Sequence, residues 1–282
     1  MNSILKPLLI VGTQLRHKYF LSVLLKNFSL SGVIFYERSL VQPPPALLKN
    51  KEQYYSNYSK EDIELESLHL SNLKNKEEEY FLDEVNQIDL HNIPVLTVSS
   101  QSELNSKNTI AWLKNNVDSN VMLDYGSRIL SNEFLSILPK WKINLHGGLS
   151  PYYKGSATLL WPIYMQQPEL VGTTLHLLSE KIDAGEIIQH SRPNIDELDS
   201  VADIGCKAII SASSDAVKIL NKLQENNTLE LYLQSTGKLF LERDYKPSII
   251  AVVNELMKRG LIQKYLENKE KIDMQYKFVN QL

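Results

Sequence analysis

The sequence predicts an α/β protein built on a doubly wound, mostly parallel sheet with a small C-terminal extension. Short apolar runs alternate with segments of helical period along the chain, as is typical of parallel strands joined by helices. The chain has 282 residues, which is enough to bury a large core. Apolar residues make up 43% of it and charged residues 22%, the composition of an ordered globular protein.

The amino-terminal segment is expected to form a strand, a helix and a second strand. Residues 8–11 are a short apolar run that ends at Gly12, and residues 15–28 carry apolar side chains at helical spacing. Residues 32–36 form the next apolar run. Two parallel strands joined in this way favour a right-handed crossover.

Residues 37–92 interrupt this pattern. Pro43, Pro44 and Pro45 break regular structure, and a polar segment rich in tyrosine follows them. The segment contains a charge run at residues 74–79. We expect a loop followed by one or two exposed helices, with the charge run on a solvated helix face.

The α/β pattern resumes at residue 93 and continues to the end of the chain. Strands are expected at residues 93–98, 120–125, 142–146, 173–178 and 186–190. Helices are expected around residues 102–115, within 126–139, and at 201–224 and 247–266. Residues 229–233 and 238–242 predict a β-hairpin around Ser235, Thr236 and Gly237. We therefore expect a main domain over residues 1–200, with 37–92 as an insertion, and a helical and hairpin extension over 201–282.

The charge balance of the whole chain weighs against a nucleic-acid partner, and the cysteine content excludes two kinds of site. Lys and Arg number 30 against 33 Asp and Glu, so the basic excess of most nucleic-acid-binding proteins is absent. The single cysteine, Cys206, excludes an intrachain disulfide and a CxxC metal site, and its apolar neighbours predict a buried thiol. No apolar stretch approaches the roughly 18 residues of a spanning helix or matches a signal peptide. We expect a cytoplasmic protein without nucleic-acid or membrane partners.

The predicted strand at residues 142–146 carries the most informative side chains. Asn144 and His146 project from one face of it, because side chains alternate along a strand. They stand at its carboxyl end, where open α/β sheets bind ligands, and an amide beside an imidazole can stabilise an oxyanion. Asp183 follows in a turn, where it could orient the imidazole, raise its pKa or accept a proton through water. Taken singly, these residues also fit a capping pair and a turn carboxylate.

Three sequence blocks in one order narrow these alternatives. The blocks are NLHGGLSPYYKG at residues 144–155, GTT at 172–174 and DAGEII at 183–188. Together they resemble the 10-formyltetrahydrofolate-dependent formyltransferases, which include glycinamide ribonucleotide transformylase, methionyl-tRNA formyltransferase and, most similar, the nucleotide-sugar N-formyltransferases. The resemblance covers residues 93–189 well and implies a Rossmann-like formyltransferase core. Gly147 and Gly148 replace the usual Pro-Ser, and Lys154 replaces an Arg whose bidentate contact it cannot make.

The resemblance implies formyl transfer from 10-formyltetrahydrofolate to a primary amine, without a metal. Asn144 and protonated His146 would stabilise the oxyanion, and Asp183 would hold His146 and help to remove the amine proton. The folate would lie against the chain, largely through main-chain groups, at Leu123, Tyr125, Gly126, Arg128, Leu130, Leu178 and Ile182.

The resemblance also assigns residues to the acceptor side. Tyr152, Tyr153, Lys154 and Trp161 would border the acceptor amine, with core packing as an alternative role for Trp161. Arg128 would meet the folate glutamate or remain solvated. His176 is expected to be a strand residue without chemistry.

The acceptor follows by elimination. A tRNA-directed member should carry a basic C-terminal barrel, whereas only about 90 residues follow Gln189. A purine-pathway member should be shorter and lack residues 37–92. A nucleotide-linked amino-sugar remains, in surface-polysaccharide (lipopolysaccharide) biosynthesis. The alternatives are a transferase for another small amine of the glycinamide ribonucleotide type, a 10-formyltetrahydrofolate hydrolase, and a silent folate- or nucleotide-binding module. The predicted hairpin is a candidate contact of a homodimer.

Overall fold

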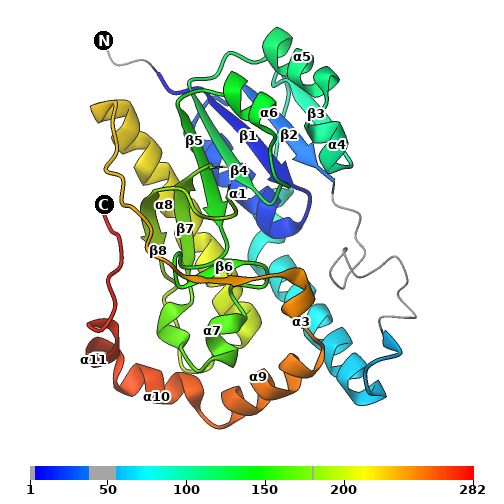
Figure 1. The fold of residues 1–282 in the computed structure, drawn as a ribbon, viewed down its shortest axis with the longest axis vertical. Helices are drawn as coiled ribbons and strands as arrows, with labels where there is room; N and C mark the ends of the chain where they lie inside the picture. Colours follow the sequence, from blue (N-terminus) through cyan, green and yellow to red (C-terminus); the bar gives the residue numbers. More distant parts are fainter. Residues whose placement is uncertain (1–3, 38–54, 180) are drawn as a thin grey trace.

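The structure is a computed structural model that describes residues 4–37, 55–179 and 181–282. A seven-stranded sheet forms its centre, in the order β3-β2-β1-β4-β5-β7-β8 (Figure 1). The strands are β1 (Pro7–Gly12), β2 (Gly32–Tyr36), β3 (Val95–Val98), β4 (Val121–Tyr125), β5 (Trp141–His146), β7 (Thr173–Leu177) and β8 (Ile187–Ser191). The first five are mutually parallel, and β7 and β8 continue the sheet as antiparallel strands. The predicted doubly wound, mostly parallel sheet is confirmed.

Helices cover both faces of this sheet. The described helices are α1 (Leu15–Asn27), α3 (Lys60–Val85), α4 (Gln101–Leu104), α5 (Lys107–Asn116), α6 (Asn132–Ile137), α7 (Trp161–Tyr164), α8 (Val201–Asn226), α9 (Ser248–Lys258), α10 (Leu261–Glu267) and α11 (Lys269–Asp273). Helices α1, α3 and α8 pack into one apolar core, and α4, α5 and α6 pack into another. Helices α9 and α10 close a third core beyond the end of the sheet.

Local sequence explains where several of these helices begin and end. Ser200 and Asp203 form a reciprocal capping box at the start of α8. The helix predicted around residues 102–115 is divided, because the Ser106 hydroxyl accepts the Thr109 N–H and starts α5. The helix predicted at residues 247–266 is also divided, at Gly260, whose φ of 77° suits glycine.

The predicted C-terminal β-hairpin is wrong. Strand β9 (Lys238–Phe240) pairs in parallel with β6 (Tyr153–Gly155), far away in the sequence, and Tyr232 forms an isolated bridge with Ile187. Gly237 lies so close to the main chain that a Cβ there would come within 1.6 Å of the Pro151 carbonyl oxygen. The two expected strands therefore pair with separate, earlier parts of the chain, and the dimer contact predicted from a hairpin loses its basis.

Helix α3 brings part of the insertion into the core. Phe81 is 1% exposed and stacks on Tyr19, with 4.6 Å between the ring centroids. In the charge run, Lys76 contacts Asp203 of α8 at 3.0 Å and Glu77 pairs with Arg16 of α1. The prediction of a solvated face is therefore wrong for Lys76 and Glu77. The three consecutive prolines lie outside the described residues.

Two further expectations can be compared with the structure. Cys206 is buried, as predicted, and burial raises the pKa of its thiol to about 12. Among the described helices, none has both the length and the apolar character that crossing a membrane requires. The division of the chain into two domains at residue 200 stays a prediction.

The docking of α3 can be tested by truncating Phe81. We expect Phe81→Ala to lower the free energy of unfolding by about 3 kcal/mol, because it leaves a cavity between α1 and α3. Leu82 is the matched control: it is 40% exposed, and Leu82→Ala should cost below about 1 kcal/mol. Urea unfolding followed by circular dichroism measures both. Equal losses would contradict the placement of α3 in the core.

Candidate active site

The candidate site lies at the carboxyl end of β5. Ile143 and Leu145 point into the main core and are 1% and 3% exposed. Asn144 and His146 therefore share the opposite face, as the alternation of the strand predicts. This face meets the loop after β7 that carries Asp183.

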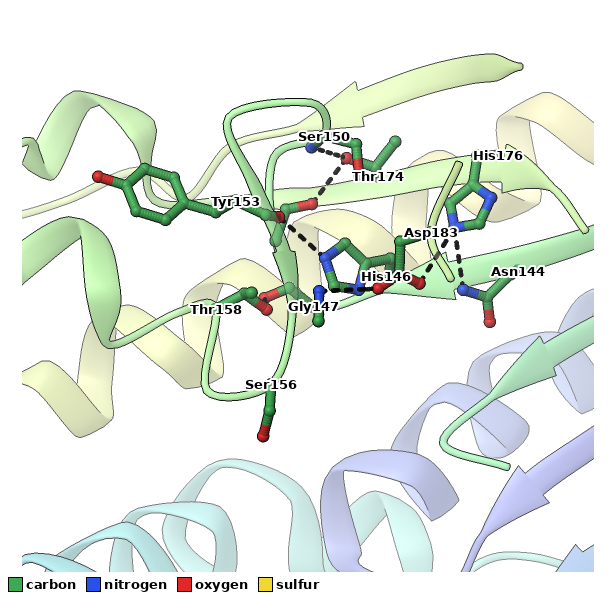
Figure 2. A network of polar contacts seen from close by, with 12 residues as sticks. Asn144, His146, Gly147, Ser150, Tyr153, Ser156, Thr158, Thr174, His176 and Asp183 are labelled. Carbon is green, nitrogen blue, oxygen red and sulfur yellow. Dashed lines mark hydrogen bonds and ion pairs between the residues drawn. The ribbon is translucent and has the colours of Figure 1, made fainter. Parts of the chain in front are cut away.

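His146 is held between two acceptors (Figure 2). Its Nε2 lies 3.0 Å from the carbonyl oxygen of Tyr153, which can only accept, so Nε2 carries a proton. Its Nδ1 lies 3.3 Å from Oδ2 of Asp183. The ring is 6% exposed, and this burial lowers the pKa of His146, outweighing the opposing effect of the Asp183 carboxylate. Burial thus favours the neutral imidazole, whereas the Asp183 carboxylate favours a proton on Nδ1.

Asp183 is an ionised carboxylate at neutral pH. Burial opposes its charge, but His146, His176 and the backbone N–H of Gly155 together lower its pKa to about 2. The Gly155 N–H donates to Oδ2 over 2.9 Å. Asp183 itself has a φ of 46°, and a Cβ at Gly185 would come within 1.7 Å of the Leu177 carbonyl oxygen. The Asp-Ala-Gly turn is therefore as tight as its sequence indicates.

His176 also contacts this cluster; it lies in strand β7, as the sequence predicts, and its expected lack of a chemical role stays a prediction. Antiparallel pairing of β5 with β7 places it directly opposite Asn144. Its Nδ1 lies 2.8 Å from the Leu177 carbonyl oxygen and carries the proton, so its Nε2 accepts from the Asn144 amide at 3.0 Å. Nε2 is 3.6 Å from Oδ1 of Asp183. Only the pairing of β7 with β5 reveals this contact.

Asn144 retains a donor for a ligand. An amide carries two N–H bonds, and His176 takes one of them. Among the described residues no partner of the second N–H is found. Asn144 is half-buried, which leaves this donor accessible.

The loop after β5 is fixed from both sides. The Thr158 hydroxyl donates to the Gly147 carbonyl over 2.6 Å. Thr174 donates to the Gly148 carbonyl over 2.7 Å and accepts the Ser150 N–H over 2.9 Å. A Cβ at Gly148 would come within 2.6 Å of the Tyr153 carbonyl oxygen and 2.8 Å of Nε2 of His146. The second glycine of the Gly-Gly pair therefore permits the hydrogen bond that orients His146.

Five of the residues predicted on the folate side lie in β4 or in the loop that follows it. The side chains of Leu123, Tyr125 and Leu130 are buried, so only their main-chain groups could face a ligand. Gly126 has a φ of 88° and packs on the ring of His17, which is 4.5 Å from the ring of Tyr125.

The other three predicted folate-side residues are more accessible. Arg128 pairs with Glu242 at 3.3 Å rather than standing free in solvent. Leu178 is half-buried and Ile182 is 44% exposed. Folate binding by these segments stays a prediction.

Two residues predicted on the acceptor side are core residues, which for Trp161 is the alternative role that the sequence also allowed. Tyr153 is 1% exposed and Trp161 is 4% exposed, and both rings stack on Phe240. The Tyr153 hydroxyl donates to Gln167, and the Trp161 indole N–H donates to Ser156. Their side chains are therefore unavailable to an acceptor. Lys154 and Tyr152 remain partly accessible, with Tyr152 against Tyr276.

One acidic residue beside the cluster has no counterpart in the sequence prediction. Asp124, at the end of β4, is 5% exposed and in register with Asn144.

Among the described residues, no group of three or more His, Cys, Asp or Glu side chains is arranged to hold a metal ion.

Comparison with known proteins identifies the family. The sequence profile of a family described as "Formyl transferase" matches residues 48–223, more than half of the chain. The chain belongs to the formyl transferase family. A methionyl-tRNA formyltransferase of Desulforamulus reducens is 32% identical over 136 residues, which are 48% of this chain and 42% of that protein. The chain thus spans about two fifths of the length of that curated relative.

Solved formyltransferases share the fold. An N-formyltransferase from Helicobacter canadensis, in complex with folinic acid and dTDP-3-aminofucose, matches with a TM-score of 0.51 at 18% identity, over 93% of this chain and 82% of that chain. Phosphoribosylglycinamide formyltransferase from Anaplasma phagocytophilum matches with a TM-score of 0.53 at 16% identity, over 85% of this chain and 98% of that chain.

The charge on Asp183 predicts a pH dependence of stability. Its pKa of about 2 is below the ordinary value of 3.8, so its contribution is fully present above pH 4 and is lost as pH falls towards 2. Asp183→Asn should be less stable than the wild type at pH 6. The difference should shrink by about 1 kcal/mol by pH 3. Urea unfolding at both pH values measures it, and a constant difference would contradict an ionised Asp183 paired with the imidazoles.

Proposed function

We propose that this protein transfers the formyl group of 10-formyltetrahydrofolate to the amino group of a nucleotide-linked amino-sugar. The observation that carries the proposal is the cluster of Asn144, His146 and Asp183 at the carboxyl end of β5, in a member of the formyl transferase family. It combines a free amide donor, a titratable imidazole and a fixed carboxylate within one site.

In the proposed reaction the amine nitrogen attacks the formyl carbon, and the formyl oxygen becomes an oxyanion. The second N–H of Asn144 donates to this oxyanion. Since the amide cannot lose a proton in the accessible pH range, its donor is available throughout turnover. Removing one such donor from an enzyme costs about 10²–10³ in turnover.

The proton follows a path through His146. The attacking amine passes a proton to Nδ1 of His146, and the Asp183 carboxylate at 3.3 Å stabilises the resulting imidazolium. When the intermediate collapses, the bond from carbon to N10 of the folate breaks and His146 returns the proton to N10. The products are the formamide and tetrahydrofolate. A lowered pKa of His146 assists this second transfer, because the imidazolium gives up its proton readily.

The folate fits best outside the ends of β1 and β4. The strand order reverses between these strands, and α/β sheets bind ligands at such a switch point. The loop after β4 contains Gly126 and Arg128 and lies next to the site. Tyr125 and Leu130 turn their side chains inward there, which favours recognition of the pterin by main-chain groups.

The choice of a nucleotide-linked amino-sugar rests on the similar fold of the Helicobacter canadensis enzyme. That enzyme was solved with such a sugar, and the match covers 93% of this chain. The similar fold of the Anaplasma phagocytophilum enzyme, of which 98% is covered, favours a glycinamide ribonucleotide type of acceptor as the second candidate. We place the sugar reaction in the cytoplasm, in surface-polysaccharide biosynthesis.

The proposed mechanism predicts the effect of three substitutions. Asn144→Ala, His146→Ala and Asp183→Ala should each lower turnover by about 10² or more, because each removes a donor or a proton carrier from the transition state. Lys181→Ala is the control, since this residue lies in the same loop and is exposed. Release of tetrahydrofolate, followed by absorbance, measures all four variants. A His146→Ala variant with near-normal turnover would refute the mechanism.

The acceptor can be identified by substrate choice. We expect tetrahydrofolate release from 10-formyltetrahydrofolate to depend on an added nucleotide-linked amino-sugar, with mass spectrometry detecting the formamide. Glycinamide ribonucleotide is the comparison substrate, and omission of any amine is the control for hydrolysis. Release with glycinamide ribonucleotide alone would favour the second candidate. Equal release without an amine would identify a hydrolase.

A further inference from the structure

Asp124 is a buried acid that the proposed mechanism does not use. It lies at the carboxyl end of β4, 5% exposed, on a strand whose other side chains are apolar except for Tyr125. Its hydrogen-bond partner is in the next turn: the Ser127 hydroxyl donates to Oδ2 over 2.7 Å and the Ser127 N–H reaches Oδ1 at 3.3 Å. The carboxyl group thus closes the turn that begins the loop at residues 125–130.

The sheet aligns Asp124 with the candidate site. Parallel pairing of β4 and β5 places it beside Asn144, and antiparallel pairing of β5 and β7 places Asn144 beside His176. Register partners on neighbouring strands face the same side of a sheet, so the three polar side chains form one row. On the other side of β4, the register partner of Asp124 is the apolar Ile10 of β1.

The surroundings of Asp124 disfavour its charge. Burial raises its pKa to about 7, and the hydrogen bonds from Ser127 only partly oppose this effect. The charged or titratable groups that act on it are His176 of β7, which lowers the pKa, and Asp183 of the following loop, which raises it. Asp183 is already ionised, so a charge on Asp124 would be the second negative charge of the site.

We propose that Asp124 is a positioning residue for formyl transfer: as a neutral acid it fixes the loop at residues 125–130 through Ser127 and keeps a second negative charge away from the developing oxyanion. The inference rests on the proposed function. It accounts for an acid at a position where an apolar side chain would make the fold more stable, since an ionisable group in such a place costs stability and is typical of functional sites.

The matched variant is Asp124→Asn, which keeps the shape and an acceptor for the Ser127 N–H but is neutral at every pH. In the wild type, the pKa of about 7 lies above the ordinary 3.8, so stability falls as pH rises from 4 through 7. The Tm of Asp124→Asn should therefore rise relative to that of the wild type by about 5 °C between pH 5 and pH 8. A residue with only a structural role would lower Tm on substitution at all these pH values.

Activity provides the second measurement. Relative to Asp124→Asn, kcat/KM of the wild type for formyl transfer should fall about tenfold between pH 6 and pH 8, because the protonated fraction of Asp124 falls in that range. Ser127→Ala retains the acid but removes a hydrogen bond that favours the carboxylate. The fall of Tm and of kcat/KM with rising pH should therefore occur at higher pH in Ser127→Ala than in the wild type.

The outcomes separate the two proposals. Parallel pH profiles of the wild type and Asp124→Asn, in Tm and in kcat/KM, would overturn the inference. A pH-independent loss of both in Asp124→Asn would also overturn it. Absence of formyl transfer by the wild type with every acceptor would refute the proposed function. The Tm comparison would still decide whether Asp124 holds a proton in the folded protein.

Discussion

The carboxylate of Asp183 joins three segments that are far apart in the chain. It accepts the Gly155 N–H of β6, contacts Nδ1 of His146 on β5 and lies 3.6 Å from Nε2 of His176 on β7. A buried charge is stable only when it is paired and hydrogen-bonded, and these contacts together favour the ionised form of Asp183. The rest of the site geometry follows from this one anion. It selects the orientation of His146 and makes further negative charge in the site unfavourable.

The antiparallel extension of the sheet is the second constraint. Strand β7 runs opposite to β5, and this direction brings His176 across from Asn144 and Thr174 across from His146. One of these side chains fixes the amide of Asn144, and the other holds the loop of Gly148 and Ser150. The site therefore depends on the change of strand direction as much as on the residues themselves.

Segments from outside the main sheet complete the surroundings of the site. Strand β9 pairs with β6 and holds the residues that follow the Ser150 loop. The chain's last residues reach the same loop through His190, which accepts the Val279 N–H at Nδ1 and contacts the Ser150 carbonyl oxygen at 2.8 Å through Nε2. Burial lowers the pKa of His190 to about 4, so the ring is neutral and can accept at one nitrogen and donate at the other. The C-terminal part of the chain thus supports the site loop directly.

The sequence alone determined the strands of the sheet, the shared face of Asn144 and His146, and the tight turn at Asp183. These features depend on the periodicity of apolar residues and on the backbone freedom of glycine in turns, and both effects extend over only a few residues. Tertiary structure decided the rest: the pairing of β9 with β6, the docking of Phe81 and Glu77, the burial of Tyr153 and Trp161, and the contacts of His176 and Asp124. Each depends on residues far apart in the chain, because burial and pairing are set by the elements that meet in the fold. A pKa depends on the same surroundings, so the different charge states of Asp124 and Asp183 could be assigned only in the folded protein.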